Sequence, residues 1–71
     1  MRVFTVLSSH LTAIDSAGRG VPIYNNDIFF VFSKKDDIIG KMLLILTKDG
    51  ITADLLISKY QNFDKCVAEL L

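Results

Sequence analysis

The sequence predicts a small α+β domain, in which a mainly antiparallel β-sheet of about five strands carries one C-terminal α-helix packed on one face. The 71 residues allow a single domain, residues 1–71. The chain is rich in Ile, Val and Phe, which favour strands. Seven of the eight acidic residues are Asp, which favours turns and caps over helix interiors, so little helix is expected.

The N-terminal third of the chain predicts three short strands. Residues 2–7 alternate weakly between polar and apolar side chains and predict the first strand. Residues 11–15 and 21–24 flank a loop with two glycines, which supply the positive φ angles of a tight turn, so the two segments predict a hairpin. Pro22 has no N–H group to donate, so we expect its strand at a sheet edge.

The middle of the chain predicts a turn, a strand and a connector. Residues 25–27 (Asn-Asn-Asp) are typical of a turn, and residues 28–32 form a continuous apolar run that predicts a strand. Residues 33–37 (Ser-Lys-Lys-Asp-Asp) predict a polar connector.

Residues 38–46 fit two structures. As a helix capped by Asp36, this segment would place five apolar residues on one face: Ile38, Ile39, Met42, Leu43 and Leu46. However, Gly40 interrupts it, and a Lys-Asp-Gly loop at residues 48–50 favours a hairpin between residues 42–47 and 51–57, with Gly50 in the left-handed conformation. We favour the hairpin and keep the helix as the alternative.

The C-terminal segment predicts the single helix. Ser58 with Gln61 three residues later fits a capping box, and Asn62 is an alternative cap that would give a shorter helix. The apolar residues of this segment fall on one helical face: Tyr60, Phe63, Val67, Leu70 and Leu71.

Two central runs, residues 29–32 and 42–46, are apolar on both faces of a strand. One short helix covers only one face, so a curled sheet, a second subunit or a hydrophobic partner must cover the other. A domain of this size buries only about 60% of its unfolded surface, and one cysteine excludes an internal disulfide, which favours a homo-oligomer. We expect partner contacts at Phe29 or Phe30, depending on the register, and at Phe32 and Leu44.

The sequence shows no catalytic or metal-binding pattern. The one imidazole, His10, has no nucleophile at a recognisable spacing, and the one thiol, Cys66, has no activating neighbour. One His and one Cys cannot complete a structural zinc site of the Cys/His type. We therefore expect no enzyme activity, no cofactor, no metal and no disulfide.

The charges balance, with eight Lys and Arg against eight Asp and Glu. Nucleic-acid binding is the alternative function, through Arg19 in the first hairpin or through Lys34 and Lys35 in the connector. Residues 15–22 (Asp-Ser-Ala-Gly-Arg-Gly-Val-Pro) are similar to the D-x-x-G-R…V-x-P stretch of swapped-hairpin antitoxins and transition-state regulators, in which the Arg contacts DNA. The short helix and the basic residues expected nearby in that family are absent here, so we do not assign the chain to it.

The predicted function is a small cytoplasmic interaction or regulatory protein that binds and modulates a larger protein, as a homo-oligomer. No apolar run reaches the 18 or so residues that would cross a bilayer, and the N-terminal run ends at Ser8, too early for a signal-peptide core. A free cysteine fits a reducing compartment. We expect no membrane partner.

Overall fold

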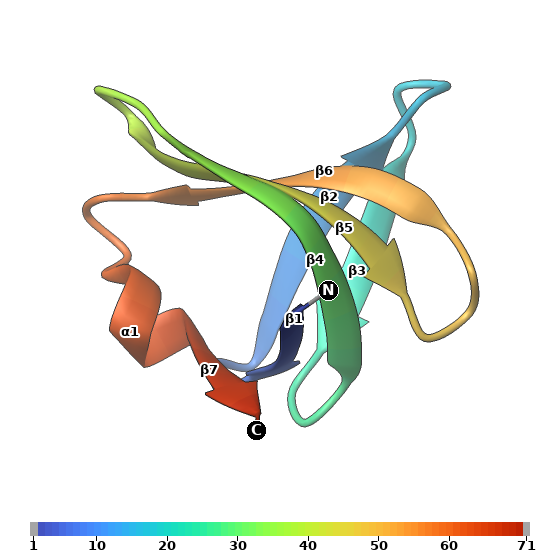
Figure 1. Cartoon of the computed structure of the whole chain (residues 1–71), viewed down its shortest axis with the longest axis horizontal. Coiled ribbons are helices and arrows are strands. Elements are labelled where there is room, and N and C mark those ends of the chain that lie inside the picture. Colours follow the sequence, from blue (N-terminus) through green and yellow to red (C-terminus); the bar gives the residue numbers. More distant parts are fainter. Residues whose placement is uncertain (1, 71) are drawn as a thin grey trace.

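The chain forms one antiparallel sheet of seven strands and a single helical turn (Figure 1). The computed structural model describes residues 2–70. The elements in chain order are β1 (Arg2–Val6), β2 (His10–Asp15), β3 (Gly20–Tyr24), β4 (Ile28–Asp36), β5 (Gly40–Thr47), β6 (Thr52–Ser58), α1 (Phe63–Cys66) and β7 (Val67–Leu70). The predicted α+β fold, with about five strands and a helix covering one face, is therefore wrong: strands hold 64% of the chain and the helix 6%.

The sheet curls into a half-barrel because of its strand order, β3-β2-β6-β5-β4-β1-β7. β1 and β2 follow each other in the chain but lie four places apart in the sheet. A flat sheet would separate them by about 19 Å, whereas the four residue steps from Val6 to His10 reach about 14 Å at most. The sheet must bend to bring the two strands together, as Figure 1 shows. The radius of gyration of 10.9 Å matches the value of about 11 Å expected for a compact domain of this length.

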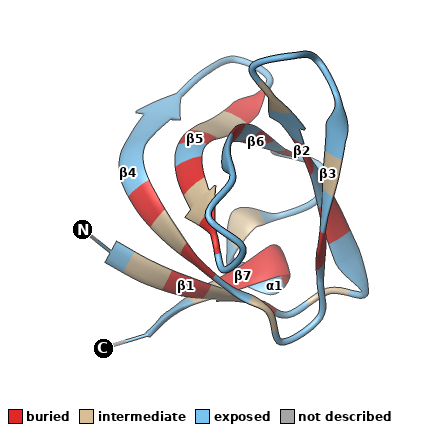
Figure 2. Cartoon of the chain, turned by 90° about the vertical axis from the view of Figure 1, so that its right-hand side faces the viewer, coloured by how far each residue is buried: buried red, intermediate tan, exposed pale blue. Residues whose placement is uncertain are grey.

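The hydrophobic core fills the inner face of the curl. Figure 2 marks the buried residues, which alternate with more exposed ones along the strands. Side chains alternate along each strand, so that one set faces inward and the next faces outward. Cross-strand partners share a face, and the inward pairs include Phe4 with Phe29 and Leu43 with Leu55. The Phe4 and Phe29 rings stack with their centroids 5.9 Å apart. Half-buried Phe63 of α1 packs edge-on against Phe4 at 6.0 Å, so the helical turn covers one end of the core.

Both predicted hairpins are present. β2 pairs with β3 around Gly18, whose φ is 79°, and Pro22 lies in β3 at the end of the strand order, as expected for an edge. β5 pairs with β6 around Gly50, whose φ is 83°. Residues 40–47 are therefore a strand, and the helical alternative for residues 38–46 is wrong.

The predicted connector at residues 33–37 is wrong for most of its length, because β4 continues to Asp36. Four of these polar residues pair with β5: Ser33 with Leu44, Lys34 with Leu43, Lys35 with Met42 and Asp36 with Lys41. A bulge at Phe32 lies between the apolar and the polar parts of the strand. The extra residue shifts the alternation of inward and outward side chains by one position. Val31 is therefore the last inward residue before the bulge, and Lys34, opposite inward-facing Leu43, is the first one after it.

The predicted C-terminal helix is reduced to one turn. Of the two proposed caps, Asn62 is the one that forms, and it caps α1 by accepting a hydrogen bond from the Asp64 N–H at 3.2 Å. At Ser58 only the reciprocal bond of a capping box is present, from the Ser58 N–H to Gln61 Oε1 at 3.0 Å, and no helix begins there. After Cys66 the backbone becomes extended, and β7 pairs with β1 in the register Val6 with Val67 through Val3 with Leu70. Pairing with a distant strand overrides the helical spacing.

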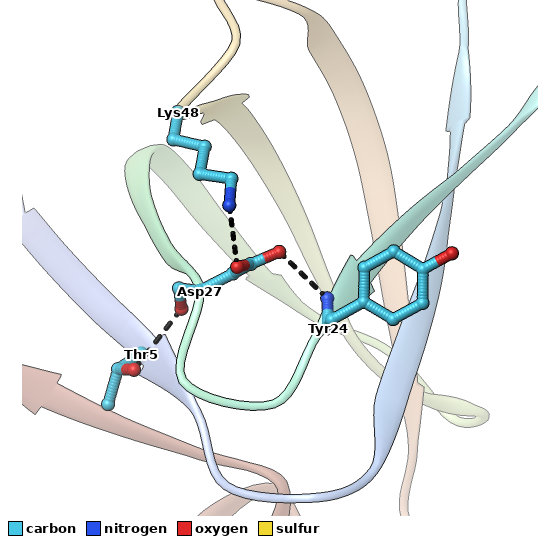
Figure 3. Close-up of polar contacts among 4 residues, drawn as sticks. All are labelled: Thr5, Tyr24, Asp27 and Lys48. Carbon is cyan, nitrogen blue, oxygen red and sulfur yellow. Dashed lines mark hydrogen bonds and ion pairs between the residues drawn. The ribbon is translucent and has the colours of Figure 1, made fainter.

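Asp27 ties together three segments that are distant in sequence (Figure 3). Its carboxylate accepts hydrogen bonds from Lys48 Nζ at 2.8 Å and from the Tyr24 N–H at 3.0 Å. Its carbonyl oxygen accepts from Thr5 Oγ1 at 3.1 Å and from the Val6 N–H at 3.1 Å. The hydrogen bond from Lys48, and then that from Tyr24, hold the pKa of Asp27 below its ordinary value. The turn after β3 is thereby fixed to β1 and to the loop after β5.

β5 and β6 approach each other closely at Gly40, which is buried. A Cβ atom at this position would overlap the carbonyl oxygen of Ile57 and lie 2.6 Å from the Cα of Ser58. Only glycine leaves room for the two strands to pair at this end of the hairpin.

Candidate interaction surface

The outer face of the sheet carries an apolar surface over β4, β5 and β6. We call it the outer patch and define it by six residues: Phe30, Phe32, Met42, Leu44, Leu46 and Leu56. The first half of β4 has Phe29 and Val31 buried, so Phe30 between them points outward. The same alternation on β5 and β6 turns Leu44 and Leu56 outward while Leu43 and Leu55 are buried. Leu44 is 37% exposed, Leu56 38% and Phe32, the extra residue of the bulge, 49%.

The register joins these side chains into one continuous surface. Phe30 of β4 lies opposite Leu46 of β5, and Met42 of β5 lies opposite Leu56 of β6. Leu44 lies between these two pairs along β5 and is flanked by Ser33 and Asp54. Cross-strand neighbours on one face have their Cβ atoms about 5 Å apart. The side chains of the outer patch therefore contact one another, and only their outer surfaces contact solvent.

Two charged residues of opposite sign lie on the same face, on opposite sides of β5. Lys35 of β4 is opposite Met42, and Asp54 of β6 is opposite Leu44. Both are exposed, and among residues 2–70 neither takes part in an ion pair within 4.0 Å. The outer patch is thus apolar along its middle strand, with one positive and one negative group beside it.

The structure places three of the four predicted contact residues in the outer patch. Phe30, Phe32 and Leu44 lie there, whereas Phe29 is fully buried in the core and its side chain cannot reach a partner. The sequence left open whether Phe29 or Phe30 faces outward, and the pairing of Phe4 with Phe29 answers it. Sequence reasoning missed Met42, Leu46 and Leu56. The alternation along residues 42–46 and 52–58 could have identified them once Leu43 or Leu55 was known to face inward.

A second feature is a hollow of about 430 Å³ at the rim of the inner face, where Arg2, Lys34, Lys41 and Glu69 surround Phe63. The Nζ atoms of Lys34 and Lys41 lie 5.6 and 5.5 Å from the Phe63 ring centroid. Arg2 donates to both Glu69 carboxylate oxygens, at 2.7 and 2.8 Å. These hydrogen bonds raise the pKa of Arg2 and lower that of Glu69.

The charges of this rim are largely compensated. Lys41 donates to Asp36 at 3.0 Å, and that hydrogen bond lowers the pKa of Asp36. Asp64 adds a further carboxylate to the lining of the hollow. The rim therefore offers paired charges around an aromatic ring and no concentrated positive field of the kind that attracts a polyanion.

The structure separates the residues of the nucleic-acid alternative. Arg19 lies in the turn between β2 and β3, whereas Lys34 and Lys35 lie on β4. Figure 1 shows the tip of the β2–β3 hairpin and the tip of the β4–β5 hairpin at opposite upper corners of the molecule. Lys34 pairs with inward-facing Leu43 and Lys35 with outward-facing Met42, so the two lysines point to opposite faces of the sheet. The backbone N–H of Arg19 donates to Asp15 Oδ1 at 2.9 Å, which is ordinary turn chemistry.

The remaining chemical groups stand apart from one another. His10 is exposed, with its ring centroid 6.3 Å from that of Tyr24. Cys66 is buried and its thiol donates to the Gln61 carbonyl oxygen at 3.5 Å. Within residues 2–70 no three His, Cys, Asp or Glu side chains gather as a set of metal ligands. The described part of the chain also contains no helix long and apolar enough to cross a membrane.

Comparison with protein-family models, with curated proteins and with solved structures finds no match. The function is therefore argued from the geometry of the two surfaces described above.

Proposed function

We propose that this chain is a small non-enzymatic interaction protein, which associates through its outer patch and modulates a larger protein. The outer patch carries the proposal. Among residues 2–70, fourteen buried hydrophobic residues form the core on the inner face, so the six outward side chains are not needed to fill it. Clustered apolar side chains left in water commonly mark a surface for protein contact.

The chemistry of the two surfaces supports binding over catalysis. The outer patch has aromatic, Leu and Met side chains with charged groups only at its sides, which is the composition of an interface centre with a polar rim. A reducing cytoplasm remains our proposal for its location, because Cys66 is an unpaired thiol.

Photo-crosslinking at single positions tests the proposal. Benzoyl-phenylalanine introduced at Leu44 should give a covalent adduct with a protein chain in cells, whereas the same group at exposed Ser16, in the β2–β3 turn, should not. Adding Leu56→Lys should abolish the Leu44 adduct, because Leu56 belongs to the same surface. Equal adducts from both positions, or none from Leu44, would contradict the proposal.

A further inference from the structure

The residues of the outer patch also indicate what covers it. We propose that the occupant is a second copy of this chain, packed face to face about a twofold axis that runs over β5 between Met42 and Leu44. This inference rests on the proposed function, since it names the partner of the same surface.

The area of the patch favours a second copy as its occupant. A fully exposed aromatic or large aliphatic side chain presents roughly 200 Å². With Phe32 49%, Leu44 37%, Leu56 38% and neighbouring Ile14 47% exposed, and the other members less exposed, these side chains present on the order of 450 Å² of apolar surface. A standard interface buries roughly 800 Å² per partner, so polar residues beside the patch would have to supply the remainder. The apolar share would then be about 56%, the share found in non-obligate interfaces.

The charges beside the patch also favour a second copy. In a twofold dimer each contact occurs twice, because residue i of one copy meets residue j of the other and the reverse. Lys35 and Asp54 are the charged residues that flank the patch across β5, and they have opposite signs. A second copy can therefore place its Asp54 over Lys35 and its Lys35 over Asp54, with two attractive pairs and no like-charge contact.

The register fixes the geometry of such a dimer. Lys35 and Asp54 lie two strands apart, about 10 Å, and one outward position apart along the strands, about 7 Å. The twofold axis that places Asp54 of one copy over Lys35 of the other runs perpendicular to the line joining these two residues, at about 35° to β5. The strands of the two copies therefore cross at twice this angle, roughly 70°, near the orthogonal class of sheet packing. Leu56 lies directly under this axis and meets Leu56 of the second copy.

Sedimentation of the full chain at micromolar concentration tests the inference. The expected mass is twice the 7.9 kDa of the chain, and Leu44→Lys should reduce it to that of a monomer. Lys35→Asp and Asp54→Lys should each raise the dimer dissociation constant about tenfold, because both symmetry-related pairs become repulsive. The double variant should restore dimerisation. Circular dichroism should show that every variant retains the strand spectrum.

A cysteine at the axis gives an independent test. Leu56→Cys should form an intermolecular disulfide on mild oxidation, whereas Ser16→Cys should form little. The unsubstituted chain is the background control, since its Cys66 is buried.

The outcomes separate this inference from the proposed function. A monomer in sedimentation, or a double charge variant no tighter than the single ones, overturns the second-copy arrangement. If the Leu44 photo-adduct then has a mass other than twice that of the chain, the interaction function stands without self-association. A monomer without any photo-adduct overturns both.

Discussion

Replacing Gly40 by Ala should destabilise the fold more than the same substitution at any other glycine. The added Cβ would overlap the Ile57 carbonyl oxygen and lie 2.6 Å from the Ser58 Cα, both of which are backbone atoms that cannot rotate away. Relief therefore requires β5 and β6 to separate at this end of the hairpin. Overpacking of a rigid site costs about 1–3 kcal/mol, and the absence of a movable side chain places Gly40 at the upper end of that range.

The other three glycines form a matched control series. At Gly20 the Cβ would meet only Thr12 Cγ2, at 3.4 Å, so Gly20→Ala should change the free energy of unfolding by less than about 1 kcal/mol. Gly18 and Gly50 have open space around them but φ angles of 79° and 83°. Their Ala variants should each lose about 1–2 kcal/mol, from the left-handed backbone alone.

Urea and thermal unfolding followed by far-UV circular dichroism measure the series. For a domain of this size 1 kcal/mol corresponds to about 4–8 °C in Tm, so Gly40→Ala should lower Tm by roughly 10–20 °C. The reasoning fails if Gly40→Ala unfolds at the same urea concentration as the unsubstituted chain. It also fails if Gly50→Ala is the less stable of the two, because backbone conformation would then outweigh the steric overlap.

Three further measurements test the described packing. Phe29→Ala should cost about 3–5 kcal/mol of stability and outward-facing Phe30→Ala less than about 1.5 kcal/mol; equal losses would contradict the assigned faces of β4. The pKa of the Asp27 carboxyl is lower in the folded chain than in the unfolded chain. The ionised carboxylate therefore stabilises the fold in full above the unfolded pKa of about 3.9. This stabilisation is lost as the pH falls through the lower pKa of the folded state. Asp27→Asn should therefore be less stable than the unsubstituted chain at neutral pH and lose less stability on acidification, while parallel pH profiles would exclude this role. The Cys66 thiol should react with a thiol reagent only as fast as the fold opens, since it is buried; rapid labelling of the native chain would show that the thiol is open to solvent in the folded state.

The parts of the fold that depend on local residue choice could be predicted from the sequence. Glycines at positive φ identified both hairpins, Pro22 identified an edge strand, and Asn62 was recognised as a possible cap. Each of these signals acts within a few residues of the chain. The surplus of apolar residues at 42–46 indicated an apolar contact face and led to Leu44 as a contact residue, while its outward position became known only from the structure.

The parts that depend on distant pairing could not be predicted. The residues from Ser33 to Asp36 are polar and typical of a connector, yet they extend β4 because β5 supplies partners for them. Val67 and Leu70 fit a helical face, and only the free edge of β1 makes them a strand. The choice between Phe29 and Phe30 depended on a register that is set by residues in β1 and β5.

The pairing of β7 with β1 has a consequence for how the chain acquires its fold. The ion pair between Arg2 and Glu69 joins groups 67 residues apart, and within residues 2–70 β7 pairs only with β1. β1 is synthesised before β7, so this edge of β1 stays unpaired until residues 67–70 have been made. Until then Val6 lacks Val67, its cross-strand partner in the core. Closing this edge is a long-range pairing step, and sheets built from non-local contacts fold in milliseconds to seconds.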